Sequence, residues 1–456
     1  MRVLITTLSV AVMAVLGNPG YQLVTALHAG ADVDALQIPS SGASPAGESG
    51  EALTSPGTAS GNIGEAVSVA SAREGVITGA EILLRDSLHL VRGKRIGLIT
   101  NPTALTHDGK HTIDLLAENP EVKLQVLFAP EHGLRGGMDA GAHIANGTDL
   151  PSGLPVRSLY GETMKPTREM LRDVDILVFD MLDISARTYT YIWTMTLAME
   201  AAAEAGIPFL VLDRPNPVTG KVGGPLPSMS ALRTGPRITG HWPVPFRHGM
   251  TPGEIARYAN GEFGVGASLT VVPVEGWHRT DWYDGTGLPW VNPSPNIRSL
   301  DAALNFTGLG SLEATSLSLG RGTDEPFTVV GAPWLDTDAL LQRLSTYSIP
   351  GAVFEATRFV PSGDGWMQFR GTSVKGVRIR ILDRDLYDPS FVSLVLLAEV
   401  YRLHPRQLGM NSMKHVMDDS TAEEIRRGVD PVQIAARWRT EDEAWQNRTA
   451  MYRLYQ

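Results

Sequence analysis

Short apolar segments alternate with segments of helical periodicity in the first half of the chain. The predicted strands are Arg95–Thr100, Lys123–Ala129, Asp175–Asp180 and Ile207–Leu212. The predicted helices are Gly79–Leu90, Lys110–Glu118, Pro166–Arg172 and Tyr191–Ala205. Strands that are apolar along their length and alternate with helices form a parallel sheet covered on both faces. The sequence therefore predicts an α/β fold, with a Rossmann-like doubly wound parallel sheet in residues 76–246.

Strands and helices alternate less regularly in residues 247–456. A capping box, Thr251-Pro-Gly-Glu254, opens a predicted helix that runs to Asn260. The other predicted elements are strands at Ser268–Val274, Val353–Phe359 and Val374–Leu382, and helices at Thr337–Thr346 and Ser390–His404. This irregular order is typical of an α+β domain, which we expect to be the smaller of the two.

The N-terminus has the pattern of an export signal. Arg2 precedes an apolar stretch from Val3 to Leu16, and the small-residue segment Val24-Thr-Ala26 resembles a cleavage site. We therefore expect a signal peptide at residues 1–29, an exported protein, and no stable membrane span after processing. An N-terminal helix or a retained membrane anchor is the alternative.

Low-complexity sequence follows this signal. Of the twenty-one residues from Ser40 to Ser60, eighteen are Ser, Gly, Ala, Pro or Thr. Such a segment cannot bury enough apolar surface to offset the entropy of ordering it. We therefore expect a disordered linker at residues 30–75.

Charge and cysteine content exclude several classes of function. The net charge is −10, whereas a nucleic-acid-binding protein needs a basic surface. The chain has no cysteine, which excludes disulfide scaffolds, zinc ribbons and thiol catalysis.

Polar and ionisable residues follow each of the four predicted strands. They are Asn101 after the first strand, Glu131, His132 and Arg135 after the second, Asp180, Asp183, Arg187 and Tyr189 after the third, and Asp213, Arg214 and Asn216 after the fourth. In an open parallel sheet, ligands bind beyond the carboxyl ends of the strands. We therefore expect the functional site at this edge of the sheet.

The loops at this edge lack the motifs that hold common cofactors. There is no G-x-G-x-x-G, no G-x-x-x-x-G-K-[ST] and no G-x-S-x-G nucleophile elbow. We therefore predict no cofactor and no metal ion. His107 and His111 are expected to flank or cap a helix, while a metal site at His132, Asp139 and His143 stays open as an alternative.

The remaining chemistry is that of carboxylates. Glycoside hydrolysis needs an acid that protonates the leaving oxygen and, commonly, a second carboxylate. Glu131 is the predicted acid, and Asp183 or Asp180 is the predicted second carboxylate. A cap or an ion pair is the structural alternative for Glu131, and a strand-end cap is the alternative for Asp180.

Two further groups of residues suit a charged sugar but also have structural alternatives. Four aromatic residues within fourteen positions either stack on a sugar or pack in the core: Trp277, Trp282, Tyr283 and Trp290. Four arginines either bind a substrate carboxylate or form surface ion pairs: Arg135, Arg187, Arg298 and Arg321.

Nine short motifs occur in order from about Val76 to the C-terminus. They are Thr100-Asn-Pro-Thr103, Pro130-Glu-His-Gly-Leu-Arg135, Ser158-Leu-Tyr-Gly-Glu162, Tyr189-Thr-Tyr191, Asp213-Arg-Pro-Asn-Pro217, Arg247-His-Gly-Met250, Gly276-Trp277, Pro293-Ser-Pro-Asn296 and Gly320-Arg-Gly-Thr323. In these motifs the chain resembles the NamZ-type exo-β-N-acetylmuramidase family. The chain departs from that family at two places. Family members often have His at the position of Pro102, and they often have Gln near the position of Leu182.

The resemblance implies a Rossmann-like domain and a smaller domain with an active-site cleft between them. It implies removal of N-acetylmuramic acid from the non-reducing end of peptidoglycan fragments, which are the expected partners. It makes Glu131 the leading catalytic residue and places other residues around the cleft: Asn101, His132, Arg135, Asp183, Arg187, Tyr189, Asn296, Glu313 and Arg321. A non-catalytic binding protein for cell-wall fragments and a metal-dependent hydrolase are the alternative functions.

Overall fold

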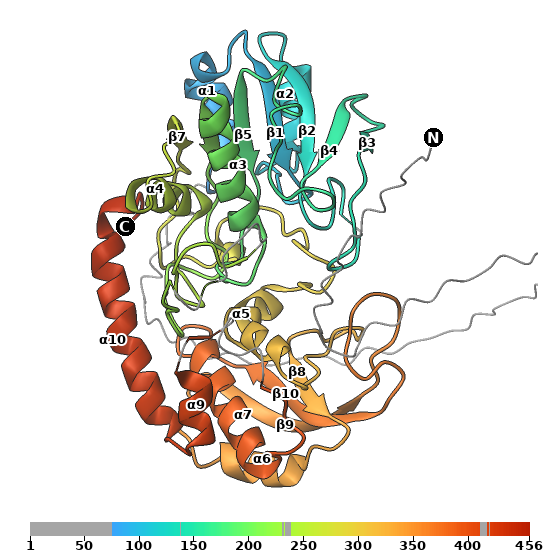
Figure 1. Ribbon diagram of the computed structural model, residues 1–456, viewed down its shortest axis with the longest axis vertical. Coiled ribbons are helices and arrows are strands. Elements are labelled where there is room, and N and C mark those ends of the chain that lie inside the picture. Colours follow the sequence, from blue (N-terminus) through green and yellow to red (C-terminus); the bar gives the residue numbers. More distant parts are fainter. Residues whose placement is uncertain (1–74, 137, 230–231, 233–238, 411–416, 419) are drawn as a thin grey trace, which may run out of the picture. The chain divides into compact units, whose positions relative to one another are not determined.

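The computed structural model describes residues 75–456, except 137, 230–231, 233–238, 411–416 and 419 (Figure 1). The predicted signal peptide at 1–29, and the predicted linker at 30–75 apart from its last residue, lie outside the described residues. Within the described part of the chain, no helix is both long enough and apolar enough to cross a membrane.

Seven strands form the larger sheet, in the order β3-β4-β2-β1-β5-β6-β7 (Figure 1). They are β1 Arg95–Thr100, β2 Lys123–Ala129, β3 Gly147–Thr148, β4 Pro155–Ser158, β5 Ile176–Asp180, β6 Phe209–Leu212 and β7 Leu269–Val272. All neighbouring strands are parallel except β3, which is antiparallel to β4. The order reverses at β1, with β2 on one side and β5 on the other. Such a switch point opens a crevice beyond the carboxyl ends of the strands.

Helices cover both faces of this sheet. They are α1 Gly79–Asp86 and α2 Thr112–Glu118 on one face, and α3 Tyr191–Ala205 and α4 Pro252–Glu262 on the other. Side chains of a strand alternate between its two faces. In β5, Ile176 and Val178 accordingly pack in the core with α1 and α2, whereas Leu177 and Phe179 pack with α3 and α4. Both faces of β5 are therefore buried, which explains its continuous apolar sequence.

Local sequence signals set the ends of two helices as expected. Helix α3 has the predicted bounds and ends at Gly206, whose φ of 69° is readily adopted by glycine. Helix α4 begins at the predicted capping box, in which Thr251 accepts from the backbone of Glu254 and the Glu254 side chain accepts from the backbone of Thr251.

The second sheet is smaller and antiparallel, in the order β8-β10-β9. Its strands are β8 Val329–Ala332, β9 Ala352–Phe359 and β10 Val374–Ile381. The accompanying helices are α5 Leu300–Leu309, α6 Thr337–Leu344, α7 Pro389–Leu403, α9 Thr421–Arg426 and α10 Pro431–Thr449. The predicted fold class, a doubly wound parallel sheet followed by a smaller mixed region, is confirmed.

Several predicted elements were wrong in type or place. Residues 166–172 form turns rather than a helix, because only isolated hydrogen bonds such as Leu171 N–H to Thr167 O close there. The strand predicted at Ser268–Val274 for the second region is β7, which pairs in parallel with β6 of the first sheet. Helix α5 was not predicted, since its run of small and apolar residues is buried on all sides and has no amphipathic period.

Candidate active site

A pocket of about 250 Å³ lies beyond the carboxyl ends of β2, β4 and β5. We call it the inner pocket. The residues that line it are Glu131, His132, Ala140, Tyr160, Thr188, Tyr189, Thr190, Thr239, Ser294, Ile297, Phe306, Glu313, Arg321 and Phe327. The first seven come from loops of the large sheet, and the last four come from the region that contains the small sheet. The pocket expected between the two regions is therefore present.

Glu131 is held through both of its carboxylate oxygens. The chain turns sharply after it, because His132 and Gly133 have left-handed backbone with φ of 68° and 77°. The Gly141 N–H donates to Oε1 at 2.9 Å, and the Thr190 hydroxyl donates to Oε2 at 2.8 Å. These contacts are neither a helix cap nor an ion pair. They fix the orientation of a carboxylate that is largely buried but lines the pocket.

His132 lines the pocket next to Glu131. Its Nδ1 lies 2.8 Å from the carbonyl oxygen of Met138. A carbonyl only accepts hydrogen bonds, so Nδ1 carries the proton. In the neutral ring, Nε2 is then the acceptor.

Glu313 and Arg321 form an ion pair on the wall of the pocket supplied by the second region. Glu313 lies in a 3₁₀ turn, Gly310–Ala314, directly after α5. The guanidinium of Arg321 also lies over the ring of Phe327, with Cζ 5.0 Å from the ring centroid. This places a second carboxylate and a cation in the pocket that contains Glu131.

The charges in the pocket affect one another. Burial lowers the pKa of Arg321, but the carboxylates of Glu313 and Glu131 outweigh this effect and the pKa is raised overall. Burial and the charge of Glu131 both raise the pKa of Tyr160. Tyr160 therefore stays a neutral phenol beside Glu131 at ordinary pH.

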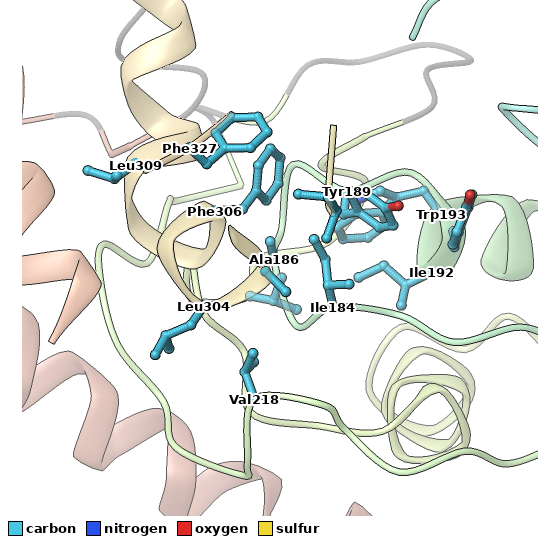
Figure 2. Close-up of a cluster of buried hydrophobic side chains, with 14 of the residues drawn as sticks. Ile184, Ala186, Tyr189, Ile192, Trp193, Val218, Leu304, Phe306, Leu309 and Phe327 are labelled. Atoms are coloured by element: carbon cyan, nitrogen blue, oxygen red, sulfur yellow. The ribbon is translucent and has the colours of Figure 1, made fainter. Parts of the chain in front are cut away.

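Aromatic rings form one wall of the pocket. Tyr189 lies edge-on to Phe306, with ring centroids 5.8 Å apart, and Phe306 lies edge-on to Phe327 at 4.8 Å (Figure 2). Tyr189 precedes α3, whereas Phe306 lies in α5 and Phe327 precedes β8. The wall thus joins residues from both regions.

Asp183 and Asn101 lie near the pocket but do not line it. Asp183 Oδ2 accepts from the Ser185 N–H at 2.6 Å and lies 3.2 Å from Nε2 of His248. Asn101 Oδ1 accepts from the backbone and the hydroxyl of Thr103. Both side chains therefore order the loops that follow β5 and β1. Glu313 is the second carboxylate that lines the pocket, and the catalytic role of Asp183 stays a prediction.

Two predicted substrate-binding arginines have other partners. Arg135 forms a two-pronged ion pair with Asp149, with N–O distances of 2.9 and 2.8 Å. Arg187 is buried, and its guanidinium donates at 2.7 Å to three backbone carbonyls, those of Pro225, Val244 and Met417. Burial lowers the pKa of Arg187 to about 9. Neither arginine lines the inner pocket.

Other candidates at the strand ends are structural. Asp180 forms a buried ion pair with Arg214 and also accepts from the hydroxyl of Thr112. His111 caps α2, as predicted, by accepting from the N–H of Ile113. These side chains hold the strand ends and the first turn of α2 in place.

The aromatic cluster after β7 belongs mainly to the core. Trp277 and Tyr283 are buried in a hydrophobic cluster with Val76 and Leu182, and Trp290 packs against it. These residues do not line the inner pocket, so the structure favours the core-packing alternative for them. Among the described residues, no group of three His, Asp or Glu side chains is arranged to hold a metal ion.

Sequence reasoning missed several lining residues. Thr190, Tyr160 and Ser294 lie in three of the motifs named above, but their residue types did not suggest chemistry. Asn296 and Arg298 were predicted to bind substrate. They do not line the inner pocket but a second hollow of the surface, which is described below.

We predict that Arg187 is structural. Its replacement by Leu leaves three buried carbonyls without donors, which should lower the free energy of unfolding by about 3 kcal/mol or more. Chemical denaturation measures this loss. Arg298→Leu, at an ion pair with Asp324 that is exposed on both sides, should cost about 1 kcal/mol or less. Equal losses for the two variants would contradict the structural role of Arg187.

Comparison with known proteins agrees with this architecture. Residues 96–301 match the family described as exo-beta-N-acetylmuramidase NamZ, N-terminal, and residues 304–455 match its C-terminal counterpart. The chain is 43% identical over 333 residues to the peptidoglycan beta-N-acetylmuramidase NamZ of Bacillus subtilis, covering 72% of this chain and 78% of that protein.

Two crystal structures of DUF1343 family proteins from Bacteroides fragilis are also similar. One is 34% identical with a TM-score of 0.74, over 85% of this chain and all of the other. The second is 29% identical with a TM-score of 0.67, over 84% of this chain and 99% of the other. On the identity with the Bacillus protein and the two adjoining family matches, the chain belongs to the NamZ exo-beta-N-acetylmuramidase family.

Proposed function

We propose that this protein is an exported glycoside hydrolase that releases N-acetylmuramic acid from the non-reducing end of peptidoglycan fragments. The observation that carries the proposal is the inner pocket, in which Glu131 and Glu313 occur together with a cation, Arg321. The activity in the name of the Bacillus relative supports the same reaction.

The size of the pocket favours attack at a chain end. Its volume of about 250 Å³ is below the roughly 300–1,000 Å³ of pockets for drug-sized ligands. One sugar ring is therefore the expected occupant, and the rest of the saccharide lies outside. This is the arrangement that an enzyme acting on terminal residues requires.

Glu131 is assigned as the general acid. A carboxyl group in this role gives a proton to the glycosidic oxygen as the bond to the leaving sugar breaks. The Thr190 hydroxyl donates to the Glu131 carboxylate and can rotate to accept from its protonated form. The contact with Thr190 can thus hold Glu131 in both its protonated and its ionised form, and a general acid passes through both during the reaction.

Glu313 is assigned as the second carboxylate of the reaction. It lines the same pocket as Glu131, on a segment of the second region, and Arg321 is its ion-pair partner. Arg321 balances the charge of two carboxylates in a confined space, where uncompensated like charges would repel strongly. Its planar guanidinium also suits the lactyl carboxylate of N-acetylmuramic acid.

We predict that Glu131→Gln lowers kcat by at least about 10²-fold, a usual contribution of a general acid. The measurement is release of N-acetylmuramic acid from a muramyl disaccharide, with products identified by mass. Glu162→Gln is the matched control, because Glu162 is an exposed carboxylate in the loop that carries Tyr160. Activity of Glu131→Gln within a few-fold of the parent would remove Glu131 from the mechanism. Binding without turnover by the parent would indicate a binding protein.

Arg321 should determine the preference for a muramide over a glucosaminide. Loss of a charge-assisted pair worth about 1.5–3 kcal/mol should lower kcat/KM on the muramide roughly 10–150-fold. The glucosaminide has no lactyl carboxylate, so its kcat/KM should fall less in Arg321→Ala. The ratio of kcat/KM on the muramide to kcat/KM on the glucosaminide should therefore become smaller. Arg135→Ala, which is paired with Asp149, is the control. An unchanged ratio in Arg321→Ala would show that other groups bind the lactyl carboxylate.

Export is proposed from the N-terminal sequence, in which Arg2 precedes the apolar stretch Val3–Leu16. Fractionation of cells that express the full chain should find the protein outside the cytoplasm. N-terminal sequencing should find a new terminus near Ala26. Retention of the protein in the cytoplasm with Met1 intact would contradict export and leave the proposed hydrolysis untouched.

A further inference from the structure

A second, larger hollow adjoins the inner pocket. It has a volume of about 520 Å³, and Ala140 lines both spaces. Its walls include Asn296, Arg298 and the loop 360–367 that follows β9. We call it the outer basin. Its position next to the inner pocket makes it the place that the rest of a bound saccharide would enter.

An exposed indole faces this space. Trp366 lines the outer basin and has 53% of its surface exposed, which is unusual for so large an apolar side chain. The guanidinium of Arg321 lies over the ring of Trp366 at 5.7 Å and over that of Phe327 at 5.0 Å. Arg321 lines the inner pocket, so one cation supports both the inner pocket and the indole of the outer basin.

The loop that carries Trp366 is anchored on both sides. The Ser362 N–H donates to the carbonyl of Gly322 at 2.8 Å. A Cβ at Gly322 would lie 2.5 Å from Sδ of Met367, so the loop packs directly on this glycine. The Asp139 carboxylate packs against Gly365 from the loop that follows Glu131. These contacts fix the loop in place, so Trp366 belongs to an ordered wall of the basin.

The charge of the basin is negative. Three carboxylates line it, those of Asp139, Asp324 and Asp364, against one cation, Arg298. Arg298 is already paired with Asp324 at 3.3 Å. Like charges repel an anionic ligand, whereas carboxylates accept hydrogen bonds from sugar hydroxyls.

We propose that the outer basin is the subsite for the leaving saccharide, that Trp366 is the surface on which its first ring stacks, and that the basin favours an uncharged amino sugar over an anionic one. This proposal rests on the proposed function of the inner pocket. An aromatic face offers a large rigid apolar surface to the C–H face of a sugar ring. Trp366 then acts on substrate choice and not on the bond-breaking step.

The first test compares two substrates that differ only in the leaving group. Trp366→Ala should lower kcat/KM on muramyl-glucosamine disaccharide by roughly tenfold, the size of a stacking contact of about 1.4 kcal/mol. Muramyl fluoride, whose leaving group has no ring, should be cleaved at nearly the parental rate. Trp366→Phe should recover much of the loss, and Leu382→Ala, an exposed apolar residue after β10, is the control. Equal losses on both substrates would overturn the subsite assignment.

A second test does not depend on turnover. The disaccharide should bind Glu131→Gln, and binding to Glu131→Gln/Trp366→Ala should be roughly tenfold weaker by calorimetry. Tenfold weaker binding combined with an inactive parent would support the subsite and contradict the proposed hydrolysis. Unchanged binding with an active parent would contradict the subsite alone.

The charge preference has its own variant. Asp364→Asn should raise kcat/KM for a disaccharide with a glucuronate leaving group relative to one with glucosamine. The expected change is about two- to fivefold, because an exposed charge interacts weakly through water. If Asp364→Asn leaves the ratio of kcat/KM for the two disaccharides unchanged at both low and high salt, the charge preference is contradicted. The stacking role of Trp366 would not be affected by that result.

Discussion

The arrangement of the inner pocket depends on the buried guanidinium of Arg187. Its hydrogen bonds reach the carbonyls of Pro225 and Val244, which lie in the segment between β6 and α4, and of Met417, which lies far along the chain. A buried cation is tolerated only when its hydrogen bonds are made, and the nearby carboxylate of Asp418 offsets part of the cost. Arg187 therefore cannot shift without breaking contacts in both segments. It joins the segment before α9 to the loops of the large sheet.

The residues after Arg187 carry this constraint into the site. The carbonyl of Arg187 accepts from the indole N–H of Trp193 in α3, at 2.7 Å, so the segment between them is fixed at both ends. Thr188, Tyr189 and Thr190 in that segment line the pocket, and Thr190 donates to Glu131. The orientation of Glu131 thus depends on hydrogen bonds of Arg187, which does not line the pocket. Arg187, which the sequence offered as a ligand for a substrate carboxylate, instead holds Glu131 in place through the neighbouring residues.

The sequence was informative where a short segment decides the outcome by itself. Helix α3 and the capping box at Thr251 were predicted because propensity, caps and burial agree there. Strand β7 was assigned to the wrong region because its pairing partner, β6, lies some sixty residues earlier along the chain. Glu131 was found from its place after a strand, whereas Glu313 was placed at the cleft only by the family resemblance, and its ion pair with Arg321 was not predicted. Nothing in the local sequence indicates that a turn after α5 meets a loop after β2.

Exposure to the pocket, rather than residue type, distinguishes Glu131 and Glu313 from the buried carboxylates with structural roles. Asp180 also follows a buried strand, but Arg214 and Thr112 occupy its oxygens and no surface of it is exposed. Glu131 accepts from the Gly141 N–H and the Thr190 hydroxyl, and it lines an open pocket. The second carboxylate of that pocket comes with its own cation from the other region of the chain. Under the proposed function, one region supplies the acid and the other balances its charge, so neither half is a complete site without the other.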